Sequence, residues 1–159
     1  MAILLYRVDE RLIHGQVVLG WGGDLRPGRY IVVDDDLSAS EWEQDLYRLS
    51  VPDDVEVVFS DIGTARSKLS TWQTDAIRSV LLARDPTTMA LLADGGSFAD
   101  VHINLGGIHH QPGRREVASY LFLDDRDREA VRRMAEAGAT VTGQDLPGAH
   151  RVDLAHLLK

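Results

Sequence analysis

The chain has 159 residues, of which 44% are hydrophobic and 26% charged, with a formal net charge of −8 and no cysteine. This composition excludes a disordered or fibrous chain, and the length predicts one domain over residues 1–159. The negative charge argues against nucleic-acid binding, because neutralising phosphates requires clustered Lys and Arg. The lack of cysteine excludes disulfides, thiolate nucleophiles and iron–sulfur clusters.

The apolar runs also exclude a membrane-spanning chain. None approaches the roughly 20 residues that cross a bilayer, and the N-terminal segment becomes charged too early for a signal peptide. We therefore expect a cytoplasmic protein.

Short apolar runs rich in β-branched residues alternate with amphipathic stretches along the whole chain. This alternation is typical of repeated βαβ units, so it predicts an α/β fold: an open, mostly parallel sheet of about seven strands with helices on both faces. The predicted strands are residues 2–8, 29–34, 55–60, 76–83, 101–105, 117–123 and 139–143. Sheets of this kind bind ligands at the carboxyl ends of their strands, which directs attention to the loops that follow them.

The clearest amphipathic helix lies within residues 36–52. Its apolar residues Trp42, Leu46 and Leu49 recur at helical spacing, so we expect them to form the buried stripe of this helix. Two other large aromatic residues, Trp21 and Trp72, are expected to be exposed, where they could serve a contact between subunits. A homodimer is therefore left open.

Two later helices carry clear boundary signals. Asp85 followed by Pro86 is typical of a helix start, because Asp caps the first N–H groups and Pro fits the first helical position. In the last helix Val131 and Met134 share one apolar face, and Gly138 is expected to end it.

The loop after the first predicted strand contains residue types suited to phosphoryl transfer. A neutral imidazole, here His14, is a nucleophile near pH 7, and Arg11 offers a bidentate donor that keeps its charge. Asp9 could orient either side chain, and a helix starting near Gly15 would aim the Gly15 and Gln16 N–H groups at an anion. By spacing alone, a packed loop histidine is at least as well supported.

A resemblance adds to this local pattern. Residues 7–17, RVDERLIHGQV, match at every position the signature R-[IV]-D-[DE]-R-L-I-H-G-Q-V. The segment thus resembles the IIB component of the mannose/fructose/sorbose family of the bacterial phosphoenolpyruvate-dependent sugar phosphotransferase system. The likeness continues in RYIVVDDDLS, in HINLGGIHH and in the closing segment LFLDDRDREAVRRMAEAGATVTGQDLP, so it covers nearly the whole chain.

The resemblance implies a role for each matching residue. His14 would take a phosphoryl group from a phosphohistidine on a IIA partner and pass it to a sugar held by membrane IIC and IID components, at the inner face of the membrane. Arg11 would bind the phosphoryl group, with Asp9 in the same loop. The activity implied is that of a protein-N(pi)-phosphohistidine–sugar phosphotransferase, with no metal or organic cofactor.

The same resemblance extends to neighbouring segments. It suggests that Asp34, Asp35, Gly106 and Gly107 lie in loops near the site, and that one edge strand of the sheet, around residues 117–143, is antiparallel. It leaves the sugar unidentified, and without membrane partners the phosphorylation of His14 would serve regulation instead of uptake.

The chain departs from the family after Gly107, where a short hydrophobic stretch is usual. Here Ile108 is followed by His109, His110 and Gln111. Two adjacent imidazoles seldom point at one ion, and no carboxylate at a suitable spacing completes a ligand set, so we expect polar loop residues and no metal. The departure leaves the transfer step plausible and the identity of the partner or sugar open.

A second reading of the acidic segment after the second strand is a phosphatase site. Asp34 and Asp36 fit the D-x-D-x-S pattern of haloacid-dehalogenase-like phosphatases, in which an aspartate attacks phosphate. That chemistry also needs Mg²⁺, a distant Lys and a later acidic pair. Lys68 and the pair Asp124–Asp125 match by residue type only, and Asp124 is better explained as a helix cap.

Overall fold

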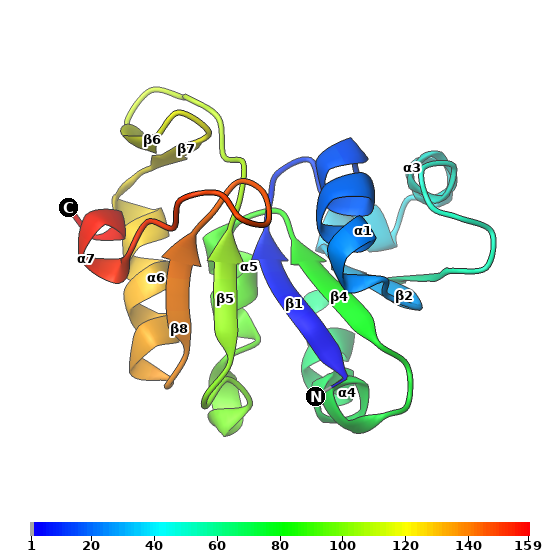
Figure 1. The fold of residues 1–159 in the computed structure, drawn as a ribbon. Helices are drawn as coiled ribbons and strands as arrows, with labels where there is room; N and C mark the ends of the chain where they lie inside the picture. The colour runs from blue at the N-terminus through cyan, green and yellow to red at the C-terminus, as the bar shows by residue number, and fades with distance from the viewer. Residues whose placement is uncertain (1) are drawn as a thin grey trace.

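Six parallel strands form the centre of the molecule (Figure 1), in the computed structural model that describes residues 2–159. Their order is β3-β2-β4-β1-β5-β8, and every pairing is parallel. The strands are β1 (Ile3–Val8), β2 (Arg29–Val33), β3 (Glu56–Ser60), β4 (Ser79–Ala83), β5 (His102–Leu105) and β8 (Thr140–Gly143). The α/β class and the parallel sheet predicted from the sequence are confirmed.

The prediction of an antiparallel edge strand around residues 117–143 is wrong. Residues 117–123 do not form one strand: β6 (Arg115–Ala118) and β7 (Leu121–Leu123) make an antiparallel hairpin outside the main sheet. The edge strand β8 runs parallel to β5, and within the described residues its antiparallel contact is an isolated bridge from Gly143 to Val152. The turn within residues 117–123 went unrecognised because the segment is almost continuously apolar.

Helices cover both faces of the sheet. One face carries α4 (Ile62–Thr74), α5 (Pro86–Leu91), α6 (Asp125–Glu136) and α7 (Leu154–Leu157), and the other carries the π-helical segment η1 (Gln16–Trp21), which continues into α1 (Gly22–Leu25), with α2 (Asp35–Ser38) and α3 (Glu41–Arg48). A short 3₁₀ turn, η2 (Asp94–Gly96), follows α5. Each face buries its own apolar cluster, because alternate strand residues point to opposite sides.

The boundary signals read from the sequence are confirmed. The Asp85 carboxylate accepts a hydrogen bond from the Thr88 N–H, and Pro86 is the first residue of α5. In α6, Val131 and Met134 are fully buried, and Gly138 turns the chain with a φ of +98°. Each of these features depends on residues close in sequence, which is why a local pattern predicts it.

The prediction for the tryptophans and for the stripe on α3 is wrong. Trp21 and Trp72 are buried, with 8% and 5% of their surface exposed, whereas Trp42, Leu46 and Leu49 are 67%, 55% and 82% exposed. α3 buries no residue and attaches to the sheet through a different face. An amphipathic pattern identifies an apolar face, but it does not determine which element covers that face.

The connections that leave the adjacent strands β1 and β5 lie on opposite faces of the sheet. The segment after β1 leads into η1 on one face, and the segment after the adjacent β5 leads through the hairpin to α6 on the other. Diverging connections leave a crevice at the carboxyl ends of the two strands, where parallel sheets bind ligands. Within residues 2–159, no helix is long and apolar enough to cross a membrane.

The burial of Trp72 and the exposure of Trp42 can be tested directly by mutation. We expect Trp72→Ala to lower the free energy of unfolding by about 3–5 kcal/mol, because it leaves a cavity between α4 and the sheet. Trp42→Ala should change it by about 0.5 kcal/mol or less, because the side chain is mostly in solvent. Urea denaturation measures both; equal losses in the two variants would contradict the burial described.

Candidate functional site

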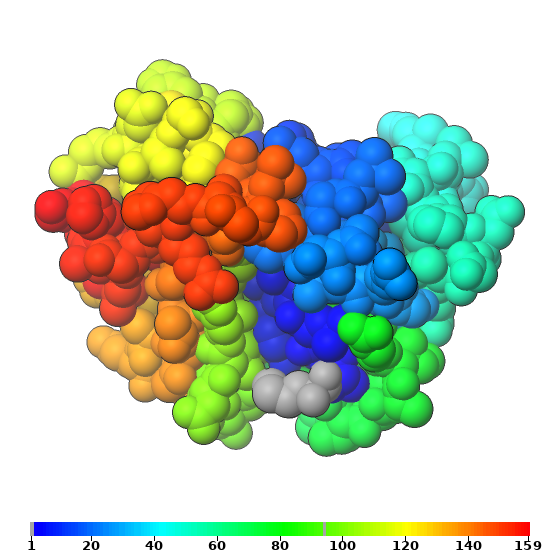
Figure 2. Space-filling model, in the orientation of Figure 1, coloured from blue at the N-terminus to red at the C-terminus, as the bar shows by residue number. Residues whose placement is uncertain are grey.

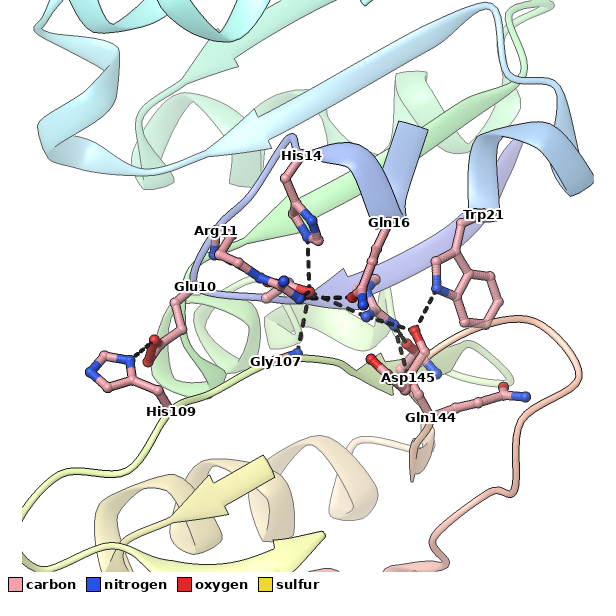
Figure 3. A network of polar contacts seen from close by, with 12 residues as sticks. Glu10, Arg11, His14, Gln16, Trp21, Gly107, His109, Gln144 and Asp145 are labelled. Atoms are coloured by element: carbon pink, nitrogen blue, oxygen red, sulfur yellow. Dashed lines mark hydrogen bonds and ion pairs between the residues drawn. The ribbon is translucent and has the colours of Figure 1, made fainter. Parts of the chain in front are cut away.

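The residues of the RVDERLIHGQV segment meet at the crevice between β1 and β5 (Figure 3). Backbone hydrogen bonds fix the segment to both neighbouring strands: the Asp9 N–H donates to the Ala83 oxygen and the Glu10 N–H to the Gly107 oxygen, each at 3.0 Å. The loop after β1 and the loop after β5 are thus joined before any side chain is considered.

The Asp9 carboxylate is the centre of the site. It is completely buried and accepts hydrogen bonds from the Arg7 guanidinium at 3.2 Å, from the Gly107 N–H at 3.2 Å and from both the N–H and Nε of Arg11, at 3.1 and 3.3 Å. Burial alone would raise the pKa of Asp9, but the nearby His14 imidazole and Arg7 guanidinium hold this pKa well below its usual value. The group is a permanent anion at neutral pH.

His14 stands over this anion with one ring nitrogen turned inward. Its Nε2 is buried and lies 3.2 Å from Asp9 Oδ2, although not along a hydrogen-bond direction. Its side chain is 16% exposed. Nδ1 makes no hydrogen bond within the described residues, and unlike Nε2 it is not a buried atom. Nδ1 is therefore the ring nitrogen with access to solvent.

Arg11 lies beside His14 on the same carboxylate, with half of its side chain exposed. Its Nη2 donates to Gln16 Oε1 at 2.9 Å, so the guanidinium is held on one side by Asp9 and on the other by Gln16. Within residues 2–159, Nη1 has no hydrogen-bond acceptor. The guanidinium is therefore oriented and still has donors for an anion.

The backbone conformation at position 15 does not require glycine. Its φ of −52° is open to any residue, and a Cβ there would meet no atom within 4 Å. The tight turn is made by Leu12, with a φ of +55°. The N–H groups of Gly15 and Gln16 donate no hydrogen bond within the described chain, as expected at the start of a helical segment.

Arg7 is a functional residue that the sequence reasoning missed. It is fully buried, donates to the Asn104 side chain, to the Gln144 and Asp145 carbonyl oxygens at 2.8 and 3.0 Å, and to Asp9. Its guanidinium also lies 5.3 Å from the centre of the Trp21 ring. The signal available in the sequence was an arginine inside the apolar strand ILLYRV, which requires buried partners.

Gly106 is required by this arginine. A Cβ at Gly106 would lie 2.2 Å from Arg7 Nη2, closer than any real contact. Because Arg7 is fixed by four partners, it has no room to give way. The two glycines after β5 thus have separate roles: Gly106 admits the buried guanidinium, and Gly107 donates its N–H to Asp9.

Glu10 was also missed, and it explains the paired histidines. One of its carboxylate oxygens contacts His109 Nδ1, and the other accepts from Arg114 Nη1 at 3.2 Å. His110 instead meets the Phe122 ring edge-on, with centroids 5.6 Å apart. The two adjacent imidazoles therefore face different partners, and Glu10 ties the β5–β6 segment to the loop of His14.

The acidic segment after β2 is used for structure. Asp34 caps α2 by accepting from the Leu37 N–H at 2.9 Å, and Asp35 accepts from the Ile62 N–H at 2.8 Å. No contact joins either residue to His14 within the described chain, so the expectation that they neighbour the site lacks a direct contact to support it. Asp124 forms a capping box with Asp127 at the start of α6, as a helix cap would.

No group of three or more His, Asp or Glu side chains in residues 2–159 is arranged to hold a metal ion. What the site offers is a solvent-facing imidazole nitrogen, an oriented guanidinium and free backbone N–H groups. Such a set can accept and hold a phosphoryl group without a cation.

Comparison with known proteins agrees with this chemistry. Residues 3–159 match the family described as the PTS system sorbose subfamily IIB component, where PTS is the phosphotransferase system. The chain belongs to this family. The sequence-based identification is thereby confirmed, together with the class of function, a phosphoryl carrier in sugar uptake, and the enzyme class, a phosphotransferase.

Several relatives of this sorbose-type IIB chain carry different sugar names. The N-acetylgalactosamine-specific IIB component 1 of Escherichia coli (strain K12) is 30% identical over 155 residues, 92% of each chain. The fructose-specific EIIB component of Bacillus subtilis (strain 168) is 24% identical over 159 residues, 100% of this chain and 97% of the relative. The E. coli mannose-specific EIIAB component is 30% identical over 138 residues, 87% of this chain and 42% of that longer protein.

Solved structures share the fold along almost the whole length. An N-acetylgalactosamine IIB component from Streptococcus pyogenes superposes with a TM-score of 0.88 at 26% identity, covering 98% of this chain and 96% of that one. The IIB domain of the Klebsiella pneumoniae sorbose permease gives 0.86 at 24% identity, covering 99% and 96%. IIB components of this family work with a IIA component and with membrane IIC and IID components.

The buried carboxylate predicts a pH-dependent difference in stability. Because the pKa of Asp9 is lower in the folded than in the unfolded chain, its stabilising effect is complete above about pH 4 and is lost as the pH falls towards the folded value. At pH 7, Asp9→Asn should lower the free energy of unfolding by roughly 3–5 kcal/mol, because Arg7 loses its counter-charge.

Urea denaturation between pH 7 and the acid range measures this difference. The gap between wild type and Asp9→Asn should narrow below about pH 4. Asp45→Asn, at an exposed position, serves as the control and should stay close to wild type throughout. A gap that does not change with pH would contradict the assignment of Asp9 as a stabilising anion.

Proposed function

We propose that His14 is the phosphoryl acceptor and donor of this IIB component, and that Nδ1 is the atom that carries the phosphoryl group. The observation that supports this most directly is the contact of Nε2 with Asp9, the carboxylate that also binds Arg11, which leaves Nδ1 as the nitrogen facing solvent. A carboxylate at Nε2 favours the tautomer with its proton on Nε2, so the lone pair is on Nδ1.

The transfer follows from this arrangement. As the phosphohistidine of a IIA donor approaches in line, the bond between phosphorus and the donor nitrogen breaks, and a bond from phosphorus to His14 Nδ1 forms. The imidazole becomes cationic while it carries the phosphoryl group, and Asp9 stabilises that charge. In the second step the hydroxyl oxygen of a sugar attacks phosphorus, the electron pair of the N–P bond returns to Nδ1, and the proton of the hydroxyl group is released to solvent.

Arg11 and the start of the helical segment stabilise the negative charge of the phosphoryl group. The guanidinium, oriented by Asp9 and Gln16, donates to the phosphoryl oxygens, and the N–H groups of Gly15 and Gln16 act as further donors. During transfer the negative charge is spread over these oxygens, and oriented donors hold the group in line between the two nitrogens, so this part of the site acts chiefly on the rate.

The partners follow from the family. We infer that residues 1–159 act as one IIB domain, charged by a IIA protein and discharged to a sugar presented by IIC and IID at the inner face of the membrane. The relatives named for N-acetylgalactosamine, fructose and mannose make a hexose or amino-hexose the substrate class to test.

Phosphorylation of His14 can be tested by reconstitution. With phosphoenolpyruvate, enzyme I, HPr and a matching IIA, the chain should acquire a label that is stable to alkali and labile to acid, as expected of a phosphoramidate. His14→Ala should abolish the label, and His109→Ala, which alters an exposed imidazole in the neighbouring segment, should retain it. Label that survives in His14→Ala would refute the assignment.

The role of Arg11 predicts a loss of rate without a loss of stability. Arg11→Ala should slow charging by about 100-fold or more, because one oriented donor to the transferring group is removed. The side chain is half exposed, so the free energy of unfolding should fall by only about 1 kcal/mol or less. Rapid-quench labelling gives the rate of charging, and urea denaturation gives the free energy of unfolding. Parallel losses of rate and stability would point to a structural role.

A further inference from the structure

Three of the six large apolar side chains that are exposed in the described residues lie on α3 or directly after it, and the others are spread singly over the surface. Trp42, Leu46 and Leu49 are 67%, 55% and 82% exposed and follow one another at positions i, i+4 and i+7, so they form a stripe along one side of the helix. We call these three residues the α3 stripe. A tryptophan and two leucines in a continuous exposed row are typical of a surface that another protein covers.

The orientation of α3 is fixed by its opposite side. Gln44 donates to the carbonyl oxygens of Leu37 and Ser38 at 2.9 and 3.1 Å, and the Tyr47 ring packs on Phe59 with centroids 6.4 Å apart. Since each helical residue advances by about 100°, these anchoring residues point away from the α3 stripe. The stripe therefore faces outward because the helix is attached by its other face.

The α3 stripe is continuous with the loop of the phosphoryl acceptor. A hollow of about 320 Å³ lies against the helix, lined by Ile13, Trp42, Glu43, Leu46, Tyr47 and Ser50. Ile13 is the residue immediately before His14. Figure 1 shows α3 at the same edge of the molecule as the start of η1, and in Figure 2 the segment containing α3 forms the rounded lobe at the right of that edge.

The charged residues around the α3 stripe indicate which kind of partner can cover it. The stripe is bordered by Glu41 and Glu43, neither of which forms an ion pair within residues 2–159, and by Asp45 and Arg48, which pair with one another, so the border is acidic in sum. A second copy of the chain is disfavoured because each copy has a formal net charge of −8, so the two copies repel one another. A lipid surface with anionic headgroups would repel the acidic border too. The stripe suits a protein whose apolar anchors are surrounded by Lys or Arg.

We propose that the α3 stripe, with the hollow at Ile13, is the docking surface for the phosphoryl donor protein. The inference rests on the proposed function, since transfer to His14 requires the donor to cover the surface around this residue. The donor is favoured over the membrane acceptor because an acidic border is repelled by the negative cytoplasmic face of a membrane. The charge of the border also predicts that charging slows as ionic strength rises.

The test compares the double variant Trp42→Ala/Leu46→Ala with Ile77→Ala. Ile77 is also an exposed apolar residue, but it lies two residues before β4, at the amino ends of the strands and so at the opposite end of the sheet from His14. With the phosphorylated cognate IIA as donor, the double variant should raise KM by about tenfold or more, with a maximal rate within about twofold of wild type. Ile77→Ala should change neither value.

Two further measurements separate docking from chemistry. Phosphoramidate, a small donor that needs no docking surface, should label His14 in the double variant as fast as in wild type. Titration calorimetry with unphosphorylated IIA should show the same tenfold loss of affinity, and it reports on docking even if His14 is not the acceptor. Wild type that binds IIA but gains no label from either donor would refute the proposed function alone.

Other outcomes would overturn the docking proposal. An unchanged KM and affinity in the double variant would do so directly. Slower discharge to sugar with normal charging would assign the α3 stripe to the acceptor proteins. A wild-type dimer that the double variant converts to a monomer, with unchanged KM, would assign it to a second copy, and loss of binding to phosphatidylserine vesicles would assign it to a lipid surface.

Discussion

The site depends on one buried carboxylate. Asp9 has no contact with solvent, yet it binds the Arg7 guanidinium, the Arg11 side chain and the Gly107 N–H, and it lies against His14. An isolated buried anion would be strongly unfavourable, so these donors are required for the carboxylate as much as it is required for them. The geometry of the imidazole and of the exposed guanidinium follows from the position of this single group.

That position is determined by segments far apart in the chain. Arg7 connects the end of β1 to Asn104 on β5 and to the carbonyl oxygens of Gln144 and Asp145 after β8, and Gly106 leaves space for it. His14, the proposed nucleophile, is therefore placed by the central strands of the sheet, although it lies in a loop. A site supported in this way is pre-organised, since little has to move when a phosphoryl group arrives.

The sequence predicts the parts of the structure that depend on neighbours along the chain. The parallel strands, the cap at Asp85 and the turn at Gly138 each follow from a short pattern, and the match of residues 7–17 predicts His14, Arg11 and Asp9 as site residues. Arg7 stood in the same matched segment, but its role depends on carbonyl oxygens more than 130 residues away. No local pattern contains that information.

The errors on α3 and on the tryptophans have a common physical cause. Periodicity reports that a helix has an apolar face, and burial depends on whether another element is available to cover that face. α3 is attached through Gln44 and Tyr47, so its apolar side stays uncovered, beside the loop that carries His14. A carrier that must associate with one protein and then with another needs exposed apolar surface near its reactive atom, and an amphipathic helix turned outward provides it without weakening the core.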